Sequence, residues 1–572
     1  MKKLLILLLA TANFYYCAPK KTAGPDSPQI RINQLGYFTN GPKKFIVADA
    51  AATSFDIIDM DGKTVFSGKL EPKGNWDKSG EAVSLGDFST FVQEGQYRIA
   101  LDNGISSYQF EIGMDVFDSV KVATMKCFYL HRISEPIEEK HAGVYKRPLG
   151  HEDLQLAFHP STGKTSGTLD TPGGWYDAGD YGKYTINTGI TVAMMLATYE
   201  KYPAAYPDGS LNIPESGNGV PDILDEAKVA IDWMLTMQDD DGGVFVKVTP
   251  LSFDGFVMPE NSKKDRVVIG KSTAAALHLA AVGAMVGRIY KPIDAEYAQK
   301  LLAAAVRAWQ WAQANPEVYY AKNPDDVSTG AYSDVRLEEE FFWAAAELFI
   351  TTGGGEYLQK IQPKLGGIKF RLEENWCNYL DNLGYYSLLG ASSPLDEAGK
   401  KQVADGLIKL ADSLSLAHQA IPYQIPVDHF IWGSSSDVLD GAMIFANAYD
   451  VTKDHKYLDR AVESFDYILG KNATGYSMIT GFGSKQVMNI HHRPSAADSI
   501  AAPYPGFVVG GPNFRLQDKG SLDAAGLHYA SELPAKSYID VVESYASNEI
   551  CINWNAPCIY MLGFFDHYKS RP

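Results

Sequence analysis

The spacing of hydrophobic residues changes once along this chain, between residues 112 and 116, and this change constrains the fold most strongly. From Ile30 to Ile112, apolar and polar residues alternate in short runs separated by Gly, Pro, Asn and Asp. These runs predict antiparallel strands, and they are RINQLGY, KFIVAD, SFDIIDMDGKTVFSG, GQYRIAL and SSYQFEI. After residue 116 the apolar residues recur at helical spacing, in DILDEAKVAIDWMLTMQ, STAAALHLAAVGAMVGRIY, EEEFFWAAAELFITTG and GAMIFANAYDVTKDHKYLDRAVESFDYILG.

The two rhythms predict two domains, which is also the default for a chain of 572 residues. About seven strands within roughly 85 residues predict an all-β sandwich of immunoglobulin type over residues 28–113. Many helices in hairpin-like succession over residues 116–572 fit an all-α toroid, in which an inner ring of helices lies within an outer ring. Periodicity alone does not separate a toroid from a solenoid, although no repeat of fixed length is visible.

The chain is acidic, with a formal net charge of -18. It has no basic stripe that would release counterions from phosphates, so we expect no nucleic-acid partner. Of the five cysteines, Cys127, Cys377, Cys551 and Cys558 lie beyond the leader and form no C-x-x-C pair. Neither a metal knuckle nor a disulfide scaffold is therefore indicated, and we expect buried free thiols.

The first residues, MKKLLILLLATA, combine two lysines, a short apolar run and small residues. This pattern predicts a secretory signal that is too short to span a bilayer, and residues 1–27 are interpreted as signal peptide and linker. Cys17 is an alternative lipid-attachment site, although the bulky residues before it argue against this. We expect an exported monomer that is periplasmic, cell-surface or extracellular, and no later segment resembles a transmembrane helix.

The stretch GGWYDAGDYGKY, Gly173 to Tyr184, places Asp177 and Asp180 three residues apart among glycines and aromatic rings. Gly and Asp are ordinary turn formers and Asp often caps a following helix, so a purely structural role is one interpretation. The other is that the bent backbone aims both acids into a wet cleft, because residues at this spacing can share one side of a turn.

Two further clusters favour the second interpretation. YIDVVESYASNEICINWNAP, residues 538–557, places Glu549 in a polar and aromatic run that is unusual for a plain outer helix. NIHHRPS, residues 489–495, places His491 and Arg493 after the glycine-rich TGFGS. Metal binding is the alternative for paired histidines, but no Cys or acid lies at ligand spacing, so hydrogen bonding to a polyhydroxylated substrate suits them better.

These stretches resemble glycoside hydrolase family 9, the inverting cellulases and related β-glucanases. GGWYDAGDYGKY is similar to its aspartate motif, SMITGFGSKQVMNIHHR to its histidine-arginine signature, and YIDVVESYASNEICINWNA to its carboxyl-end signature. The last differs at Cys551, where the family usually has Ser, Thr or Ala, and we expect a nearly isosteric thiol to do little damage. The strand-rich front end, from IRINQLGY, resembles the immunoglobulin-like module of one branch of the family.

The resemblance implies an (α/α)6 barrel and a role for each acid. Asp180 matches the general base, Asp177 the second aspartate that helps to hold the water, and Glu549 the general acid. His491 and Arg493 match the pair that contacts sugar hydroxyls. Inversion needs the acid and the base on opposite faces of the sugar, roughly 6.5–9.5 Å apart. The acid must be protonated near neutral pH, so we expect the pKa of Glu549 to be raised.

Aromatic rings are expected to line the substrate cleft. Tyr545 and Trp554 flank the acid, and Trp432 in FIWGSSSD lies in a segment that resembles a cleft loop of the family. For each ring, a place in the core is the alternative.

The chemistry itself needs no cofactor, but two metals enter through the resemblance. Glu339 and Glu340 match an acidic pair that holds structural calcium in some relatives, and hard oxygen ligands suit Ca²⁺; a solvated helix start is the alternative. Other relatives carry a Cys/His zinc cluster upstream of the aspartates. Zinc is not expected here, because RPLGHED offers His151 but no cysteine.

The implied activity is hydrolysis of internal β-1,4-glucosidic bonds in a β-glucan of the cellulose, mixed-linkage or xyloglucan type. One rival is an exo-acting member of the family, such as a β-glucosidase or glucosaminidase, because the sequence does not fix the loops that separate a cleft from a pocket. The other is a non-catalytic glycan-binding surface protein, against which the presence of all three acids argues.

Overall fold

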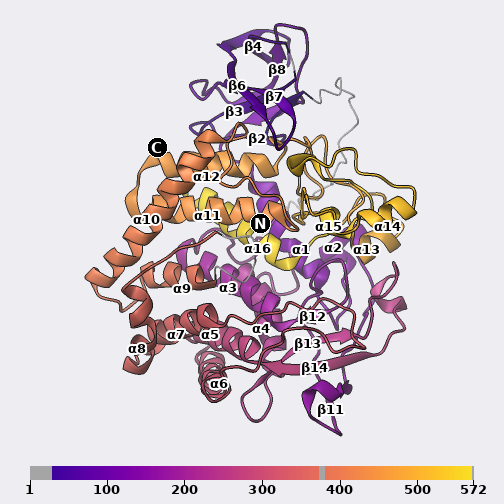
Figure 1. Ribbon diagram of the computed structural model, residues 1–572, viewed down its shortest axis with the longest axis vertical. Helices are drawn as coiled ribbons and strands as arrows, with labels where there is room; N and C mark the ends of the chain where they lie inside the picture. Colours follow the sequence, from indigo (N-terminus) through magenta and orange to yellow (C-terminus); the bar gives the residue numbers. More distant parts are fainter. Residues whose placement is uncertain (1–28, 50, 373–379, 570–572) are drawn as a thin grey trace, which may run out of the picture.

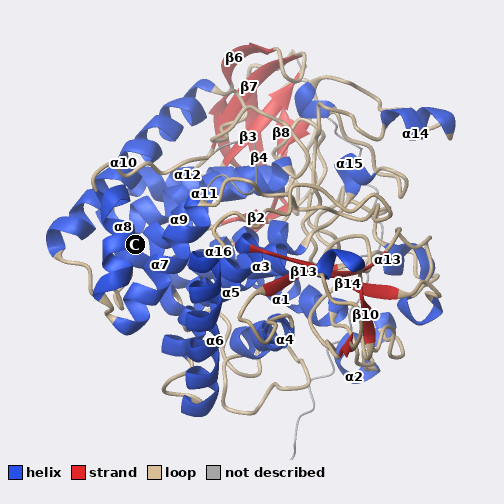
Figure 2. Cartoon of the chain, turned by 60° about the horizontal axis from the view of Figure 1, so that its bottom comes forward, coloured by secondary structure: helices blue, strands red, loops and turns tan. Residues whose placement is uncertain are grey.

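A small β-sandwich forms a lobe on a larger, mainly helical body in Figure 1. This computed structural model describes residues 29–49, 51–372 and 380–569. The predicted leader, Cys17 and Cys377 lie outside the described residues. In the larger body, long helices gather on one side, and short strands and loops gather on the other (Figure 2).

Nine strands of the described chain build the sandwich in two sheets, ordered β1-β3-β7-β6 and β2-β9-β8-β4-β5. Their bounds are Ile30–Arg31 (β1), Gly36–Tyr37 (β2), Lys44–Ala48 (β3), Ser54–Asp59 (β4), Thr64–Lys69 (β5), Glu71–Trp76 (β6), Glu81–Asp87 (β7), Gly95–Leu101 (β8) and Phe110–Ile112 (β9). Alternating burial along β4 turns Phe55 and Ile57 into the core. Phe55 meets Phe45 of the opposite sheet with ring centroids 4.9 Å apart. The predicted immunoglobulin-like sandwich is confirmed.

The strands β6 and β7 lie outside the runs from which strands were predicted. β6 reads EPKGNW, is mostly exposed, and forms the edge of its sheet. Proline and charged residues are tolerated there because one side of an edge strand makes no ladder. A register shift between Pro72 and Gly74 bends the strand further. An edge strand of this kind lacks the buried alternation by which strands are found in a sequence.

Twelve longer helices form the main framework of the described part of the second domain. They are Asp118–His131 (α1), Thr185–Lys201 (α3), Asp222–Thr236 (α4), Thr273–Ile289 (α5), Ala295–Ala314 (α6), Glu338–Thr352 (α7), Gly355–Leu365 (α8), Leu380–Leu389 (α9), Glu397–Ala420 (α10), Ser434–Thr452 (α11), His455–Ile468 (α12) and Ile552–Tyr568 (α16). Short helices are Glu139–Ala142 (α2), Arg493–Ala497 (α13), Lys519–Ala524 (α14) and Tyr545–Asn548 (α15).

Burial divides the long helices into two kinds. Every residue of α5 except Arg288 is buried, whereas the buried residues of α6 recur every three or four positions, as in an amphipathic surface helix. Gly283 lets α5 and α6 approach closely, since a Cβ atom there would lie 2.8 Å from Leu301 O. Because α5 also packs on α3 and α7, it lies inside the helical body with α6 outside it.

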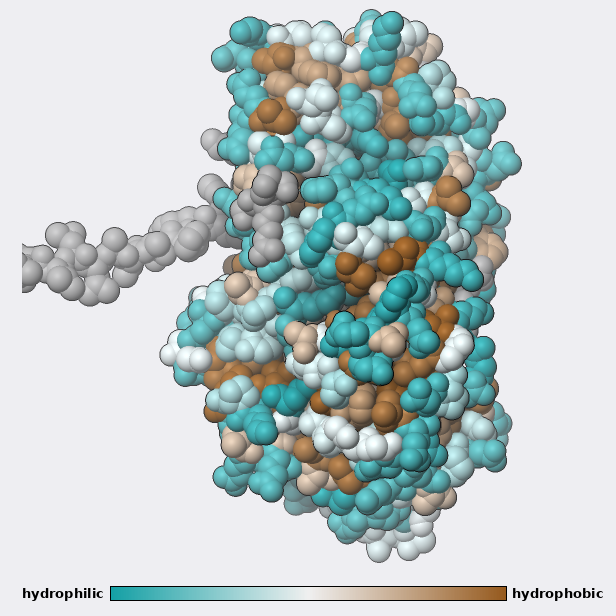
Figure 3. All heavy atoms as spheres, turned by 90° about the vertical axis from the view of Figure 1, so that its left-hand side faces the viewer, coloured by the Kyte–Doolittle hydropathy of each residue, from teal (hydrophilic) through white to brown (hydrophobic). Residues whose placement is uncertain are grey.

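No described helix is both long and apolar enough to cross a membrane. Hydrophilic residues cover much of the face drawn in Figure 3, and apolar residues lie among them in separate patches. Scattered apolar side chains of this kind are ordinary on a protein surface.

The second domain also contains a five-stranded sheet, ordered β11-β10-β14-β13-β12, which the all-α prediction did not include. Its strands are Leu156–Phe158 (β10), Thr168–Leu169 (β11), Lys183–Tyr184 (β12), Val244–Pro250 (β13) and Arg266–Ser272 (β14). The main strands read VFVKVTP and RVVIGKS, and β-branched residues favour the extended chain. β12 pairs with β13 directly before α3 begins, so the sheet anchors the end of the aspartate stretch.

The sandwich and the helical body share a packed interface. Trp76 is buried, and its ring centroid lies 4.9 Å from that of Tyr423 and 6.0 Å from that of Phe430. Buried Glu81 accepts a hydrogen bond from the Tyr423 hydroxyl at 2.8 Å and pairs with Lys536 at 2.7 Å. A buried carboxylate needs such partners, so both apolar and charged contacts hold the lobe in place.

Replacing Trp76 by Ala should destabilise the whole protein, because the cavity would open between the two lobes. Truncating a buried aromatic side chain costs about 3–5 kcal/mol. We expect the melting temperature of Trp76→Ala to fall by several degrees while activity per folded molecule is kept. Met60→Ala, at a position of the same lobe that is 55% exposed, is the control. Equal melting temperatures for the two variants would show that the lobes are energetically independent.

Candidate active site

The stretch from Gly173 to Tyr184 is an irregular loop that ends in β12 and leads into α3. Gly173 and Gly174 have φ angles of 78° and 77°, a left-handed conformation that glycine adopts at little cost. The N–H of Asp177 donates to Gly182 O at 3.1 Å, which closes the loop around the two acids. The bend inferred from the sequence is therefore present.

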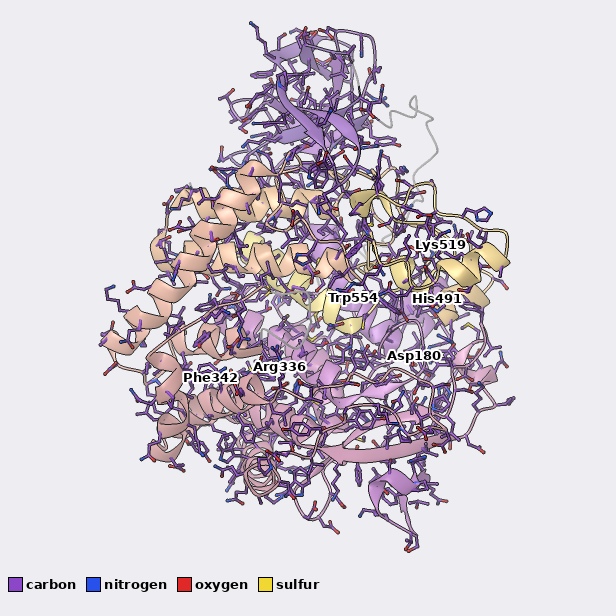
Figure 4. The ribbon with its side chains drawn as sticks, viewed as in Figure 1. Asp180, Arg336, Phe342, His491, Lys519 and Trp554 are labelled. Atoms are coloured by element: carbon purple, nitrogen blue, oxygen red, sulfur yellow. The ribbon has the colours of Figure 1, made fainter. Side chains whose placement is uncertain are left out.

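Main-chain contacts bring the three predicted motifs together. The N–H of Ile552 donates to Asp177 O at 2.9 Å, and the N–H of Arg493 donates to Gly179 O at 3.2 Å. His491 and Glu549 pair as a parallel bridge. The labelled side chains of Asp180, His491 and Trp554 accordingly lie in one region of Figure 4. Segments more than 300 residues apart in the sequence thus form one site.

Asp180 is largely buried and has two hydrogen-bond donors. Its Oδ2 accepts from the Tyr184 hydroxyl at 2.9 Å and from the N–H of Gly182 at 3.0 Å. Hydrogen bonds of this kind stabilise the ionised form of a carboxyl group, and that form is the one a general base requires.

Asp177 lies deeper and is held by three side chains. Asn187 Nδ2 donates to Oδ1 at 2.6 Å, the Tyr332 hydroxyl donates to Oδ2, and Cys551 Sγ lies 3.8 Å from Oδ2. Burial, together with the negative charge of Asp180, raises the pKa of Asp177 to about 8 in spite of these donors. Asp177 therefore keeps its proton at neutral pH.

Glu549 follows α15 and is half-buried. Burial is the main reason that its pKa is raised well above the usual value, and the charges of Asp180 and Asp177 raise it further, while Arg493 acts in the opposite direction. The raised pKa expected from the sequence is present. The site consequently combines a carboxyl group that favours its protonated form with the two aspartates of the loop.

His491 and Arg493 have different surroundings. Nδ1 of His491 lies 2.6 Å from Val542 O, so it carries the ring proton. Burial lowers the pKa of this histidine to about 4, which leaves Nε2 of the neutral ring as an acceptor. Arg493 is buried and donates to Gly179 O at 2.6 Å and Asp254 O at 2.9 Å. The arginine thereby braces the aspartate loop.

Aromatic rings continue from this pair along the site. The ring centroid of His491 lies 5.3 Å from that of Phe256 and 6.1 Å from that of Tyr545, and Tyr545 lies 5.5 Å from Trp432. Trp432 is 38% exposed and Phe256 is 42% exposed. Trp554 is half-buried behind Gly433, where a Cβ atom would lie 2.7 Å from its Nε1. The three rings named from the sequence lie near one another, and their contact with a substrate stays a prediction. Phe256 was not predicted.

The predicted calcium ligands open α7, apart from the acids in the view of Figure 4. Glu339 is paired with Arg371 at 3.4 Å and Arg336 at 3.5 Å. These two arginines already neutralise the charge of its carboxylate. Burial and the neighbouring Asp334 carboxyl raise the pKa of Glu340. Two adjacent buried carboxyls fit either a shared proton or a cation, since both relieve their repulsion. Within the described residues, no group of three or more His, Cys, Asp or Glu is placed to hold a metal ion.

His151, where a zinc cluster was considered, contacts Tyr176 with its Nδ1 2.8 Å from the hydroxyl. Burial lowers the pKa of this histidine to about 3, so the ring is neutral. Nearby Asp153 pairs with Lys183 at 2.7 Å and with Arg266 at 2.6 Å. These ion pairs hold the segment against β12 and β14.

The sequence motifs did not reveal every residue that holds the acids. Tyr184 is the last residue of the aspartate motif and Asn187 lies three residues after it, so both could have been found by asking which side chains lie close to the acids along the chain. Tyr332 lies in a loop 155 residues beyond Asp177, and no signal in the sequence connects it to the acids.

A family model described as glycosyl hydrolase family 9 matches residues 117–562. The chain belongs to this family. A second model, the cellulase N-terminal ig-like domain, matches residues 26–106, in agreement with the sandwich. The family and the accompanying module inferred from the motifs are therefore confirmed.

Individual relatives of this family 9 chain are similar over almost their whole length. The xyloglucan-specific endo-beta-1,4-glucanase BoGH9A of Bacteroides ovatus is 37% identical, over 96% of this chain and 95% of the relative. Endoglucanase D of Acetivibrio thermocellus is 33% identical, over 95% of this chain and 84% of the relative. A solved structure titled Bacteroides ovatus GH9 superposes with a TM-score of 0.87 at 36% identity, and covers 95% of this chain and 100% of that one.

Proposed function

We propose that this family 9 hydrolase cleaves internal β-1,4-glucosidic bonds of a β-glucan with inversion at the anomeric carbon. The observation that carries the proposal is the raised pKa of Glu549 beside the aspartate pair, because single displacement needs one protonated and one ionised carboxyl group. The relatives named as endoglucanases are similar over nearly the whole chain, which supports the same reaction here.

In the proposed reaction, Asp180 accepts a proton from the attacking water. The water oxygen forms the new bond to the anomeric carbon as the bond to the leaving oxygen breaks on the opposite face. Asp177 helps to hold this water in place while Asp180 takes up the proton and becomes neutral. Glu549 gives its proton to the leaving oxygen, which departs as a neutral hydroxyl.

The open row of rings from Phe256 to Trp432 supports an extended substrate. Sugar rings stack on exposed aromatic faces, and a polymer can pass along a row that is accessible on its outer side. The relative from Bacteroides ovatus is named xyloglucan-specific, and we propose xyloglucan and other soluble β-glucans as the substrates to test first. His491 Nε2 is the proposed acceptor for a sugar hydroxyl.

The proposed scaffold is the (α/α)6 barrel of the family. The mainly buried helices α3, α5, α7, α9, α11 and α16 are its inner ring, and α1, α4, α6, α8, α10 and α12 its outer ring. Contacts of α3 with α5, α5 with α7, α7 with α9, α11 with α16, and α16 with α3 support this order around the ring, and α10 packs on both α9 and α11. Each outer helix also packs on at least one inner helix.

Three further expectations stay proposals. A structural calcium ion would be held by Glu340 with Asp334, and not by Glu339, whose charge is paired with arginines. Export through residues 1–27 and lipid attachment at Cys17 concern residues outside the described chain. We also propose that the protein acts as a monomer.

Proton NMR of the first product tests the stereochemistry. Hydrolysis of a β-linked oligosaccharide should release the α-anomer first, which then equilibrates to the mixture. A nascent β-anomer would rule out single displacement.

Variants of the acid and the base should fail in different ways. Asp180→Ala and Glu549→Ala should each lose at least about 10²–10⁴-fold on a natural polymer. A dinitrophenyl glycoside needs little protonation of its leaving oxygen, so Glu549→Ala should keep much of its rate on that substrate while Asp180→Ala stays slow. Equal losses for folded Glu549→Ala on both substrates would overturn its role as the acid.

The pH profile should be broadened on its alkaline side. Glu549 donates its proton only while it is protonated, and burial keeps it protonated to a higher pH than an ordinary glutamate. The alkaline decline of kcat/KM on a soluble β-glucan should therefore lie well above the glutamate range. In Glu549→Ala with the dinitrophenyl glycoside this decline should disappear. A decline near the ordinary glutamate pKa in the wild-type enzyme would contradict the buried, protonated acid.

A further inference from the structure

A buried lysine that no motif contains lies close to both aspartates. Lys247 is in the middle of β13 and is 1% exposed. Its Nζ donates to Gly330 O at 2.6 Å, to Asn323 Oδ1 at 2.8 Å and to Thr329 Oγ1 at 3.3 Å. All three partners are neutral oxygens on one loop. A buried cation with only neutral partners is costly to the fold and therefore calls for a functional explanation.

The side chain of Tyr184 connects Lys247 to Asp180. Tyr184 and Lys247 are paired residues of β12 and β13, so their side chains are cross-strand neighbours. The lysine Nζ lies 5.5 Å from the centroid of the Tyr184 ring, and the hydroxyl of that ring donates to Asp180 Oδ2 at 2.9 Å. The negative charge of Asp180 in turn acts on the pKa of Lys247.

The loop of residues 323–332, which Lys247 binds, connects the lysine to Asp177. Gly330, which accepts from Lys247, lies two residues before Tyr332, whose hydroxyl donates to Asp177. Tyr332 has a φ angle of 48°, a conformation that is strained for a residue with a side chain and needs support from its surroundings. The rings of Tyr184 and Tyr332 meet with centroids 4.8 Å apart, so the two hydroxyl donors are braced against each other.

We propose that Lys247 is a positioning residue for the catalytic pair. It acts through Tyr184 and the loop 323–332, places one phenol hydroxyl on each aspartate, and its positive charge favours the ionised form of Asp180. The proposal rests on the proposed roles of Asp180 and Asp177 in the inverting reaction.

Several charged groups act on Asp180 together with Lys247. Asp177, Glu549 and Arg266 are other titratable groups on which the charge of Asp180 acts. Burial lowers the pKa of Lys247 to about 7, while the charge of Asp180 raises it. Lys247 is therefore charged below about pH 7.

The test compares Lys247→Met with Lys247→Arg and with Lys271→Met. Methionine keeps the length of the side chain and removes its charge. Lys271 lies on the neighbouring β14 and pairs with Asp239 and Asp241, so its replacement removes a charge from the same sheet without touching the aspartate pair.

Lys247→Met should lose about 10–100-fold in kcat with KM within threefold. Its acid decline of kcat/KM should move about half to one pH unit upward, because a nearby charge is lost. The loss should persist on the dinitrophenyl glycoside, because the substitution impairs activation of the water by Asp180 and not protonation of the leaving oxygen. Lys247→Arg should keep the acid decline at its wild-type position, and Lys271→Met should retain the wild-type rate and profile.

A wild-type position of the acid decline in folded Lys247→Met would overturn the proposal, and so would a rate equal to that of Lys271→Met. Where Lys247→Met does not fold, Lys247→Arg decides, and an acid decline displaced upward in that variant contradicts the proposal. A different result would contradict the proposed function itself. In that case the wild-type enzyme would release a β-anomer first, or would release no product from any β-glucan.

Discussion

The site depends on one main-chain contact, the hydrogen bond from the N–H of Ile552 to Asp177 O at 2.9 Å. It joins the end of the chain to the aspartate loop and places Glu549, three residues earlier, opposite the acids. The side chain of Arg493 ties the third motif to the same loop. Because backbone groups make this junction, the spacing of the acids tolerates exchange of the side chains around it. Cys551 lies at this junction, with its Sγ 3.8 Å from Asp177 Oδ2.

Three carboxyl groups share a partly buried site, so their negative charges would repel one another. Each of them has different hydrogen-bond donors and different neighbouring charges. Asp180 has a hydroxyl and an N–H donor on one oxygen. Asp177 also has donors, but it is deeper and faces the charge of Asp180, so the balance favours its neutral form. Burial and the charges of both aspartates raise the pKa of Glu549, while Arg493 and a backbone hydrogen bond at Gly179 act in the opposite direction. Burial, with charge repulsion added to it, therefore favours the protonated form of Asp177 and of Glu549.

Much of the fold could be predicted because the spacing of apolar residues along the chain differs between strands and helices. Alternating runs predicted the sandwich and helical spacing predicted the long helices, whereas β6 was missed because an exposed edge strand with Pro72 carries little pattern. The sheet around β13 was missed because its strands lie within loops of a helical domain. The acids were predicted from motifs that are contiguous in sequence. Tyr332 and Lys247 were not, because their roles arise from packing between segments that are distant in sequence.

The interface with the sandwich has a bearing on the site as well as on stability. Lys536 pairs with Glu81 of the sandwich. Glu549 lies thirteen residues after Lys536 in the sequence. Between them, Tyr538 donates to Asn548 Oδ1, the neighbour of Glu549, and Asn548 O accepts from the N–H of His491. A short run of chain therefore contacts the sandwich at one end and carries Glu549 at the other. The sandwich thus helps to fix the segment from which Glu549 projects.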